Sequence, residues 1–149
     1  MTYYFLESSA FAKLFVFEQG SAALIRLMEQ VDDSRKLVSS LASLEVRSAI
    51  RRRQRAGDIL PSDADQALDG LRAECTRIVE QPVIPAVIEG ARLVLDSHPL
   101  RALDALHLAT GVVMRDTLYV SDICFVSADD ALLKAASAEQ FLTLNPLQI

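Results

Sequence analysis

The sequence predicts an α/β domain with a mainly parallel sheet, and two observations lead to this fold class. Short apolar runs of β-forming residues alternate with longer segments of helical periodicity, which is the order of elements typical of parallel sheets. The chain has 149 residues, 51% of them hydrophobic and 23% charged, with five glycines and five prolines. This composition is typical of one compact domain over residues 1–149 and excludes a disordered, collagen-like or disulfide-scaffolded protein.

Two of the expected strands and four helices lie in the first half of the chain. The second helix has its apolar side chains on one face, and the third ends where Gly57 allows a left-handed cap. Pro61 suits the first turn of the fourth helix. In chain order the elements are a strand at 3–6, a helix from Ser8 or Ser9 to about 17, a helix at 20–31, a strand at 37–39, a helix from Ser40 or Ser43 to 55, and a helix at 61–79.

Three further strands alternate with helices in the second half. Pro85 opens one helix, whose end is marked by His98 and Pro99, and Asn145-Pro146 follow the last strand. The elements are a strand at 82–84, a helix at 85–97, a helix at 102–115, a strand at 123–126, a helix at 129–137 and a strand at 141–143.

The sequence lacks the signals of a membrane or secreted protein, so we expect a cytoplasmic one. No run without Asp, Glu, Lys or Arg exceeds ten residues, whereas a membrane-spanning helix needs roughly 18 apolar residues. The N-terminal stretch contains Glu7 and has neither the basic residues nor the cleavage site of a secretory signal. Cys75 and Cys124 have no partner at a metal-binding or redox interval, so we expect them to fill space in the core.

Four acidic residues stand in otherwise apolar surroundings, where an ionised group is costly unless something compensates it. Glu7 follows the first expected strand, and Asp129 follows the fourth. Glu45 and Asp104 lie in early turns of expected helices. If these helices start at the edge where the strands end, the four carboxylates converge where open α/β sheets build their sites.

Converging carboxylates would need a counter-ion. Two like charges repel by about 4 kcal/mol at ~4 Å and an effective dielectric of ~20. A divalent cation removes this penalty, and ligands that are all oxygen favour Mg²⁺ or Mn²⁺ over zinc. A water beside such an ion is a ready nucleophile for a phosphodiester.

Each acid alone also has a purely structural interpretation. Asp129 can be a helix cap and Asp104 a first-turn acid facing the helix dipole, worth roughly 0.3–1 kcal/mol each. Glu7 can be a surface acid at a strand end, and Glu45 can pair with Arg47 or Arg101. Asp122 competes with Asp129, because it too ends an apolar stretch. The joint occurrence of four such residues favours the shared pocket.

The four acids lie in four sequence blocks that together resemble the PIN-domain family, and within it the VapC-type toxins of prokaryotic toxin–antitoxin pairs. The resemblance covers nearly the whole chain, and all four blocks in this order are fairly specific. The blocks are Tyr-Phe-Leu-Glu-Ser-Ser-Ala-Phe-Ala-Lys-Leu-Phe at 4–15, Ser-Leu-Glu at 43–45 before an arginine-rich helix, Leu-Arg-Ala-Leu-Asp-Ala-Leu-His-Leu-Ala at 100–109, and Phe-Val-Ser-Ala-Asp at 125–129 followed by Leu-Leu-Lys-Ala-Ala at 132–136.

The resemblance implies a three-layer α/β/α domain with a five-stranded parallel sheet and an Mg²⁺- or Mn²⁺-dependent endoribonuclease site. By position, Glu7, Glu45, Asp104 and Asp129 match the acidic quartet of the family, and Ser9 matches its small hydroxyl residue beside the first acid. Toxins of this group are typically homodimers, and a cognate antitoxin holds them inactive by placing its C-terminal segment in the acidic groove. RNA, an antitoxin and a second copy of the chain are therefore the expected partners.

The mechanistic hypothesis is metal-assisted hydrolysis of RNA. Glu7, Asp104 and Asp129 would hold one or two ions, and Glu45 would orient or deprotonate the attacking water. No covalent enzyme intermediate is needed for such a reaction.

Two further residues are supporting candidates. His107, one helical turn after Asp104, either hydrogen-bonds that carboxylate or is a satisfied core histidine, and we favour the second interpretation. Asp130 directly follows Asp129, the last acid of the quartet.

The charged residues are unevenly distributed along the chain. Between Val46 and Ala56 there are five arginines and no acid, which leaves 10 of the 15 Lys and Arg residues against all 20 acids elsewhere. The net charge of −5 argues against non-specific coating of nucleic acid by the whole surface. A stripe at every fourth residue of this segment either contacts an RNA backbone or is a solvated helix face: Arg47, Arg51 and Arg55.

One residue departs from the family pattern, because the first acid is usually aspartate and here it is Glu7. The additional carbon–carbon bond adds about 1.5 Å of reach, whereas functional geometry commonly has to hold within about 0.5 Å. Two alternatives therefore stay open. One is a catalytically weakened PIN-fold interaction module whose acidic pocket binds an arginine-bearing partner, and the other is a PIN nuclease outside toxin–antitoxin systems.

Overall fold

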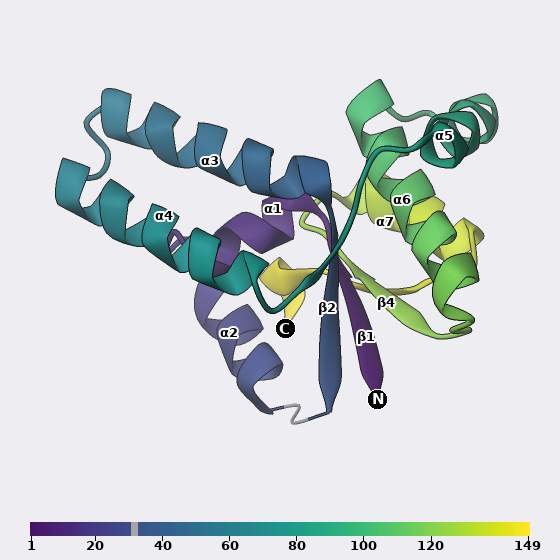
Figure 1. Ribbon diagram of the computed structural model, residues 1–149, viewed down its shortest axis with the longest axis horizontal. Coiled ribbons are helices and arrows are strands. Elements are labelled where there is room, and N and C mark those ends of the chain that lie inside the picture. The colour runs from purple at the N-terminus through teal and green to yellow at the C-terminus, as the bar shows by residue number, and fades with distance from the viewer. Residues whose placement is uncertain (31–32) are drawn as a thin grey trace.

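The computed structural model describes residues 1–30 and 33–149, and within them the predicted α/β class is confirmed by a five-stranded parallel sheet (Figure 1). Its strand order is β3-β2-β1-β4-β5. The chain builds one side of β1 first and then the other, so the boundary between β1 and β4 is the topological switch point. The strands are β1 (Thr2–Leu6), β2 (Ser34–Ser39), β3 (Val79–Gln81), β4 (Ile123–Val126) and β5 (Leu142–Leu144).

Helices cover both faces of this sheet and complete the expected three layers. Figure 1 shows α1 to α4 on one side of the strands and α5 to α7 on the other. The helices are α1 (Ser8–Phe11), α2 (Ser21–Gln30), α3 (Ser40–Arg55), α4 (Pro61–Cys75), α5 (Pro85–Ser97), α6 (Ala102–Leu118) and α7 (Asp130–Ala138), with 3-10 turns η1 (Ala12–Leu14) and η2 (Pro146–Gln148).

Side chains alternate along β1 and divide the core in two. Phe5 packs with the layer of α5 to α7, where its ring stacks on Phe125 at a centroid distance of 5.0 Å. Tyr4 and Leu6 pack with the layer of α1 to α4. Because successive residues of a strand point to opposite faces, β1 is anchored on both sides just below the acid that follows it.

The register of the central strands aligns their carboxyl ends. Leu6 of β1 pairs with Val126 of β4, and Phe5 pairs with Leu37 of β2. The ladder continues one residue past β1, because the backbone N–H of Glu7 donates to the carbonyl oxygen of Val126 at 3.0 Å. The segments after β1 and β4 therefore leave the sheet side by side.

The third strand was placed wrongly by the sequence. It is Val79–Gln81 and not residues 82–84, because residues 79–81 pair with Leu37–Ser39 of β2. Pro82 has no N–H with which to continue that ladder. The helix expected at 61–79 accordingly ends at Cys75, which leaves room for the strand.

Smaller differences concern helix ends. The first helix ends at Phe11 and continues as the turn η1 instead of running to residue 17. The helix α6 extends three residues beyond 115 to Leu118, where Tyr119 ends it in the left-handed region at φ 54°. The helix expected at 20–31 is α2, whose last expected residue lies outside the described residues. The helix at 85–97 and the strand at 123–126 have the predicted bounds.

Two compositional expectations have a structural outcome. Cys75 and Cys124 are free and only half-buried. Burial raises the pKa of Cys124 to about 11, and burial together with the nearby Glu80 and Glu74 raises that of Cys75 to about 11. In the described part of the chain, no helix combines the length and the apolar character that crossing a membrane requires.

Candidate active site

The acidic residues named by the sequence lie around the switch point of the sheet. Glu7 directly follows β1, and Asp129 follows β4 by three residues. Glu45 is the sixth residue of α3, and Asp104 is the third residue of α6. The competitor Asp122 precedes β4 and therefore lies at the opposite edge of the sheet.

The electrostatics of Asp104 show that the four carboxylates share one neighbourhood. Burial raises the pKa of Asp104, and the negative charges of Glu7, Asp129 and Glu45 raise it further, whereas His107 acts in the opposite direction. The Asp104 carboxylate accepts no hydrogen bond from any described residue. The structure thus brings the four acids together, while their catalytic roles stay a prediction.

Glu7 is the most constrained acid of the group. Its side chain is 7% exposed and caps the N-terminus of α1, where Oε1 accepts a hydrogen bond from the Ser9 backbone at 3.1 Å. Its Oε2 accepts from the Ser9 hydroxyl at 2.5 Å and from the Ser127 hydroxyl at 2.8 Å. Glu7, and not Ser8 or Ser9, therefore provides the side-chain cap of α1, and its carboxylate also reaches Ser127.

The same two serines connect Glu7 to the segment that carries Asp129. Ser9 Oγ accepts a hydrogen bond from the Ala128 backbone at 3.0 Å, and Ser127 Oγ accepts one from the Asp129 backbone at 3.1 Å. Each hydroxyl therefore donates to Glu7 and accepts from the loop after β4. This arrangement explains why a small hydroxyl residue is needed at position 9, and it adds Ser127 as a second one.

Asp129 and its neighbour Asp130 have different roles. Asp129 Oδ1 caps α7 by accepting from the Leu132 backbone at 3.1 Å, as the structural interpretation expected, and the residue also belongs to the acidic group. Asp130 Oδ1 instead accepts from the Asn145 side chain at 3.1 Å. The structure places Asp130 in a contact with the C-terminal segment and not among the four acids.

Glu45 is held by two residues from other helices. Its Oε1 accepts a hydrogen bond from the Ser8 hydroxyl at 2.7 Å and lies 2.6 Å from His107 Nε2. Burial by itself would raise the pKa of Glu45, but the hydrogen bonds from His107 and Ser8 and the charge of His107 outweigh it and lower the pKa. The alternatives of an arginine partner for Glu45 and an Asp104 partner for His107 are both wrong. His107 is buried, as the favoured core interpretation expected, but it bonds Glu45 and its Nδ1 has no hydrogen-bond partner among the described residues.

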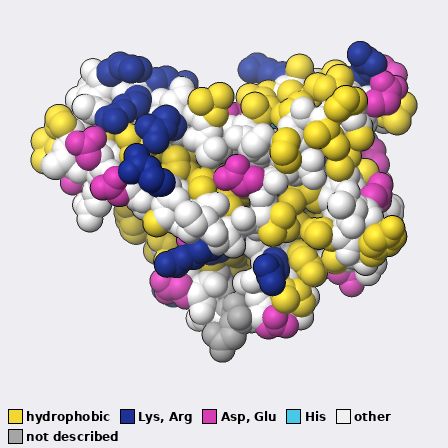
Figure 2. Space-filling view, in the orientation of Figure 1, with side chains coloured by type: hydrophobic (Ala, Val, Ile, Leu, Met, Phe, Trp, Pro, Cys, Tyr) yellow, Lys and Arg dark blue, Asp and Glu magenta, His cyan; other side chains and the backbone are white. Residues whose placement is uncertain are grey.

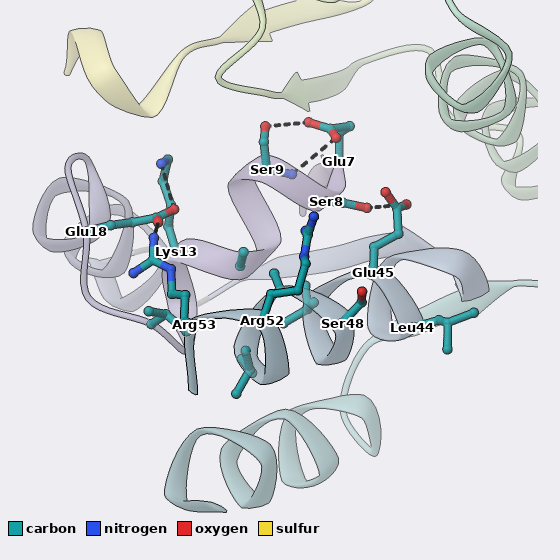
Figure 3. Close-up of a pocket in the computed structure, with 15 residues that line it drawn as sticks. Glu7, Ser8, Ser9, Lys13, Glu18, Leu44, Glu45, Ser48, Arg52 and Arg53 are labelled. Atoms are coloured by element: carbon teal, nitrogen blue, oxygen red, sulfur yellow. Dashed lines mark hydrogen bonds and ion pairs between the residues drawn. The ribbon is translucent and has the colours of Figure 1, made fainter. Parts of the chain in front are cut away.

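A pocket of about 620 Å³ opens between the segment after β1 and helix α3, and of the four acids Glu7 and Glu45 line it, whereas Asp104 and Asp129 do not. Figure 3 shows Glu7 and Glu45 on one side of it and Lys13, Glu18 and Arg53 on the other. Glu18 forms ion pairs with both cations, at 3.0 Å in the case of Lys13. The pocket therefore has an acidic end and an end where two cations share one carboxylate, which leaves a net positive charge.

Arg52 is the cation of the pocket that stays uncompensated. Its side chain lies between the two ends of the pocket and points toward α1 (Figure 3), and it forms no ion pair within the described part of the chain. Arg52 follows Glu45 by seven residues, which is two helical turns and hence the same face of α3.

The arginine stripe named by the sequence lies elsewhere on α3. The residues of α3 that line the pocket are at positions 44–46, 48–50, 52 and 53, so none of Arg47, Arg51 and Arg55 is among them. Arg51 contacts Asp65 of α4 at 3.4 Å. Counting helical turns from Glu45, rather than from the arginines, would have identified Arg52.

The donor set near the switch point has the chemistry that Mg²⁺ or Mn²⁺ requires, because it consists of carboxylate oxygens. Burial raises the pKa of Asp104 most, and the negative charges of Glu7, Asp129 and Glu45, which a cation would offset, raise it further. Among residues 1–30 and 33–149, no three Asp, Glu, His or Cys side chains are already arranged as a metal-binding group. Metal binding by these acids therefore stays a prediction.

Sequence relatives of the chain carry a common name. Ribonuclease VapC49 of Mycobacterium tuberculosis is 34% identical over 115 residues, which is 75% of this chain and 76% of that protein. Ribonuclease VapC35 of the same species is 31% identical over 144 residues, which is 97% of both chains. A comparison with models of protein families gives no match.

Solved structures with the same fold are complexes. The VapBC2 complex of Rickettsia felis, bound to a promoter DNA fragment, contains a chain with a TM-score of 0.66 and 9% identity, over 97% of this chain and 98% of that one. A chain of FitAcB from Neisseria gonorrhoeae has a TM-score of 0.61 and 14% identity, over 98% of this chain and 99% of that one. At these identities the likeness establishes the fold alone. Together with relatives above 30% identity over most of both chains, it leads to one conclusion: the chain belongs to the VapC family and has its PIN-like fold.

Proposed function

We propose that this protein is a metal-dependent endoribonuclease that hydrolyses RNA phosphodiester bonds and is the toxin of a toxin–antitoxin pair. The observation that carries the proposal is the gathering of four carboxylates around Asp104 at the switch point, beside an open pocket. The relatives named ribonuclease support the reaction class.

Three carboxylates of the chain would hold Mg²⁺ or Mn²⁺: Glu7, Asp104 and Asp129. A bound divalent cation would offset the charge on the attacking and leaving oxygens of the phosphodiester. Asp104 has both oxygens free of hydrogen bonds from the described residues, so we assign it the main share of the binding. Ser9 and Ser127 fix the direction of the Glu7 carboxylate.

Glu45 would act on the attacking water. Its lowered pKa keeps the carboxylate ionised near neutral pH, so it can accept a proton. Because Oε1 is engaged by Ser8 and His107, the other oxygen is the one that can orient the water.

Arg52 would bind a phosphate group of the RNA strand. It is a guanidinium without an acidic partner on the same helix face as Glu45, and guanidinium groups bind phosphate in a bidentate manner. Figure 2 shows Lys and Arg side chains gathered over α3, so the strand would approach from this side. The stripe of Arg47, Arg51 and Arg55 would then contribute long-range attraction instead of contacts in the pocket.

Two protein partners are part of the proposal. The solved neighbours are toxin–antitoxin complexes, and an antitoxin of this chain would place a basic segment against the acids. A second copy of the chain would cover the hydrophobic side chains that Figure 2 shows over α5 and α6. Among the large hydrophobic side chains of α5, Leu93 has the highest exposure, at 63%.

A specific observation favours a second candidate, the catalytically weakened module that binds an arginine-bearing partner. Both oxygens of Glu7 already accept hydrogen bonds from Ser9 or Ser127, which reduces their capacity as metal ligands. In this case an arginine from the partner, and not a metal ion, would neutralise the acids.

RNA cleavage with a matched pair of variants tests the proposal. The full chain should cleave RNA with Mg²⁺ or Mn²⁺ and stop when EDTA is added. Asp104→Asn should lower the rate more than about 100-fold, because outer-shell substitutions at metal sites already cost 10–100-fold. The control Asp122→Asn, at the opposite edge of the sheet, should cleave at the wild-type rate. Equal rates for the two variants would refute the site, and no cleavage by the wild type would favour the binding module.

A further inference from the structure

His107 reaches Glu45 from a different helix and is almost completely buried. It belongs to α6 and is 1% exposed, yet its Nε2 lies 2.6 Å from Oε1 of Glu45 on α3. Ser8 at the start of α1 donates to the same oxygen at 2.7 Å, and its Oγ lies 3.1 Å from His107 Nε2. Three helices therefore meet at one carboxylate oxygen.

The chemistry of the two groups determines the direction of the contact. A carboxylate can only accept, so His107 Nε2 must carry the hydrogen that points to Glu45. The other ring nitrogen, Nδ1, is buried and has no hydrogen-bond partner in the described part of the chain. A histidine that served the core alone would have both nitrogens satisfied, because an unpaired buried polar atom costs stability. The His107 ring instead forms its hydrogen bond to Glu45 through Nε2 and leaves Nδ1 unpaired among the described residues.

The hydrogen bonds from His107 and Ser8 engage one oxygen of Glu45 and leave the other free of them. Oε1 accepts from both His107 and Ser8, whereas Oε2 accepts from neither, nor from another described residue. Figure 3 shows the Glu45 carboxylate at the wall of the pocket, with one oxygen bonded to Ser8. The carboxylate is therefore fixed in rotation, with one oxygen available.

We infer that His107 and Ser8 are positioning residues for Glu45, which hold its Oε1 so that Oε2 accepts the proton of the water that attacks the phosphodiester. The inference rests on the proposed function. The proton passes from water to Oε2, and the resulting hydroxide forms the new bond to phosphorus as the bond from phosphorus to the leaving oxygen breaks. The leaving oxygen takes a proton from solvent, and Glu45 returns its proton to solvent. Neither His107 nor Ser8 contacts the substrate in this scheme.

The charged groups around Glu45 are all part of the same site. His107 and Asp104 face it from α6, Glu7 and Asp129 surround Asp104, and Arg52 lies in the shared pocket. Of these, His107 forms a direct hydrogen bond with Glu45. Loss of that bond removes a contact that favours the ionised carboxylate.

The test uses two amide substitutions that differ in reach. In His107→Gln the side-chain amide nitrogen occupies about the place of Nε2, so the hydrogen bond to Glu45 can form. In His107→Asn the amide lies nearer the backbone, at about the place of Nδ1, and cannot reach. Thr110→Val is the control, because it removes a buried hydroxyl of the same helix that donates to the Leu106 carbonyl and has no bond to Glu45.

The first measurement is an NMR titration of the Glu45 carboxyl carbon in metal-free protein. We expect His107→Asn to raise the pKa of Glu45, His107→Gln to keep it near the wild-type value, and Thr110→Val to leave it unchanged. Ser8→Ala should raise it as well, and this variant preserves the test if His107→Asn does not fold. Equal values in the Asn and Gln variants together with an unchanged value in Ser8→Ala would overturn the positioning role.

The second measurement is the pH dependence of RNA cleavage. Because the active form of Glu45 is ionised, a higher pKa moves the acidic limb of the kcat profile to higher pH. At the acidic end, His107→Asn should lower kcat by about 10–100-fold with KM little changed, and His107→Gln should restore most of it. If His107→Asn raises the pKa of Glu45 but the acidic limb of its kcat profile stays at the wild-type pH, the inference is overturned and the proposed function stays intact. A wild-type chain that does not cleave RNA would refute the proposed function instead.

Discussion

Ser127 Oγ donates a hydrogen bond to Glu7 Oε2 at 2.8 Å, although 120 residues separate the two in the chain. The contact follows from the sheet, because Leu6 and Val126, the residues just before them, are register partners in β1 and β4. Glu7 and Ser127 thus join the first and fourth strands at the switch point. Four predictions follow from this site and its surroundings.

Removal of the Ser127 hydroxyl should destabilise the protein. Ser127→Ala deletes a fully buried group that donates to a carboxylate and accepts from the Asp129 backbone. Because hydrogen bonds to charged groups contribute about 1.5–3 kcal/mol, the free energy of unfolding should fall by about 2 kcal/mol. Urea denaturation measures this. The exposed pocket serine is the control, and Ser48→Ala should change stability by less than about 0.5 kcal/mol.

Glu7→Asp, which restores the usual residue of the family, should weaken this site. The shorter side chain retracts the carboxylate by about 1.5 Å, so it cannot keep its hydrogen bonds to Ser9 and Ser127 at their present lengths. We expect the free energy of unfolding to fall by about 1–3 kcal/mol. We also expect weaker stabilisation by Mn²⁺ in a thermal melt. Stronger stabilisation by Mn²⁺ in Glu7→Asp would show that glutamate impairs the metal site, as the weakened-module alternative requires.

Asp104 should make the stability of the metal-free protein depend on pH. Burial and the neighbouring acids raise its pKa above the ordinary value of 3.8, so the folded state binds a proton more readily than the unfolded state. The resulting stabilisation is fully present below the ordinary pKa and is lost as the pH rises through the raised value. Asp104→Asn removes this penalty, so its melting temperature should exceed that of the wild type at neutral pH and converge with it in acid.

Thermal melts in EDTA from roughly pH 4 to pH 7 measure this difference. Addition of Mg²⁺ should stabilise the wild type and not Asp104→Asn, because preferential binding to the folded state raises the melting temperature. Asp122→Asn should have the wild-type dependence of melting temperature on pH and the wild-type increase on addition of Mg²⁺. A wild-type melting temperature that is insensitive to Mg²⁺ and Mn²⁺ would contradict the assignment of a metal site.

Arg52 should contribute more to RNA binding than the arginines of the stripe. Each phosphate contact on a single strand contributes roughly 0.7 to the slope of log K against log salt concentration, so Arg52→Ala should reduce the slope by about that amount. Arg47→Ala removes the same charge from an exposed position of α3 outside the pocket and serves as the control. Fluorescence anisotropy with a labelled RNA and inactive Asp104→Asn protein gives both slopes. A larger effect of Arg47→Ala would assign RNA binding to the stripe.

Local patterns in the sequence were enough to predict the fold class and to single out the four acids as candidates. Alternating side chains mark β1, whose two faces are both buried, and Pro85 marks the start of α5. Glu7 and Asp104 were identifiable because a carboxylate in an apolar segment needs compensation, and this cost depends on the segment itself. Such information is contained within a few neighbouring residues.

The contacts between distant segments were decided only by the tertiary structure. The third strand was misplaced because its pairing with β2 depends on register, which Val79 and its neighbours do not reveal on their own. The partners of Glu45 and Glu7 lie 62 and 120 residues away, at His107 and Ser127, and were not predicted. Helix α6 carries Asp104 and His107 one turn apart, yet packing directs the imidazole to α3. The sequence alone determined which charged groups stand in apolar segments. The packing of strands and helices decided which groups they meet, because a hydrogen bond depends on distances that no local pattern encodes.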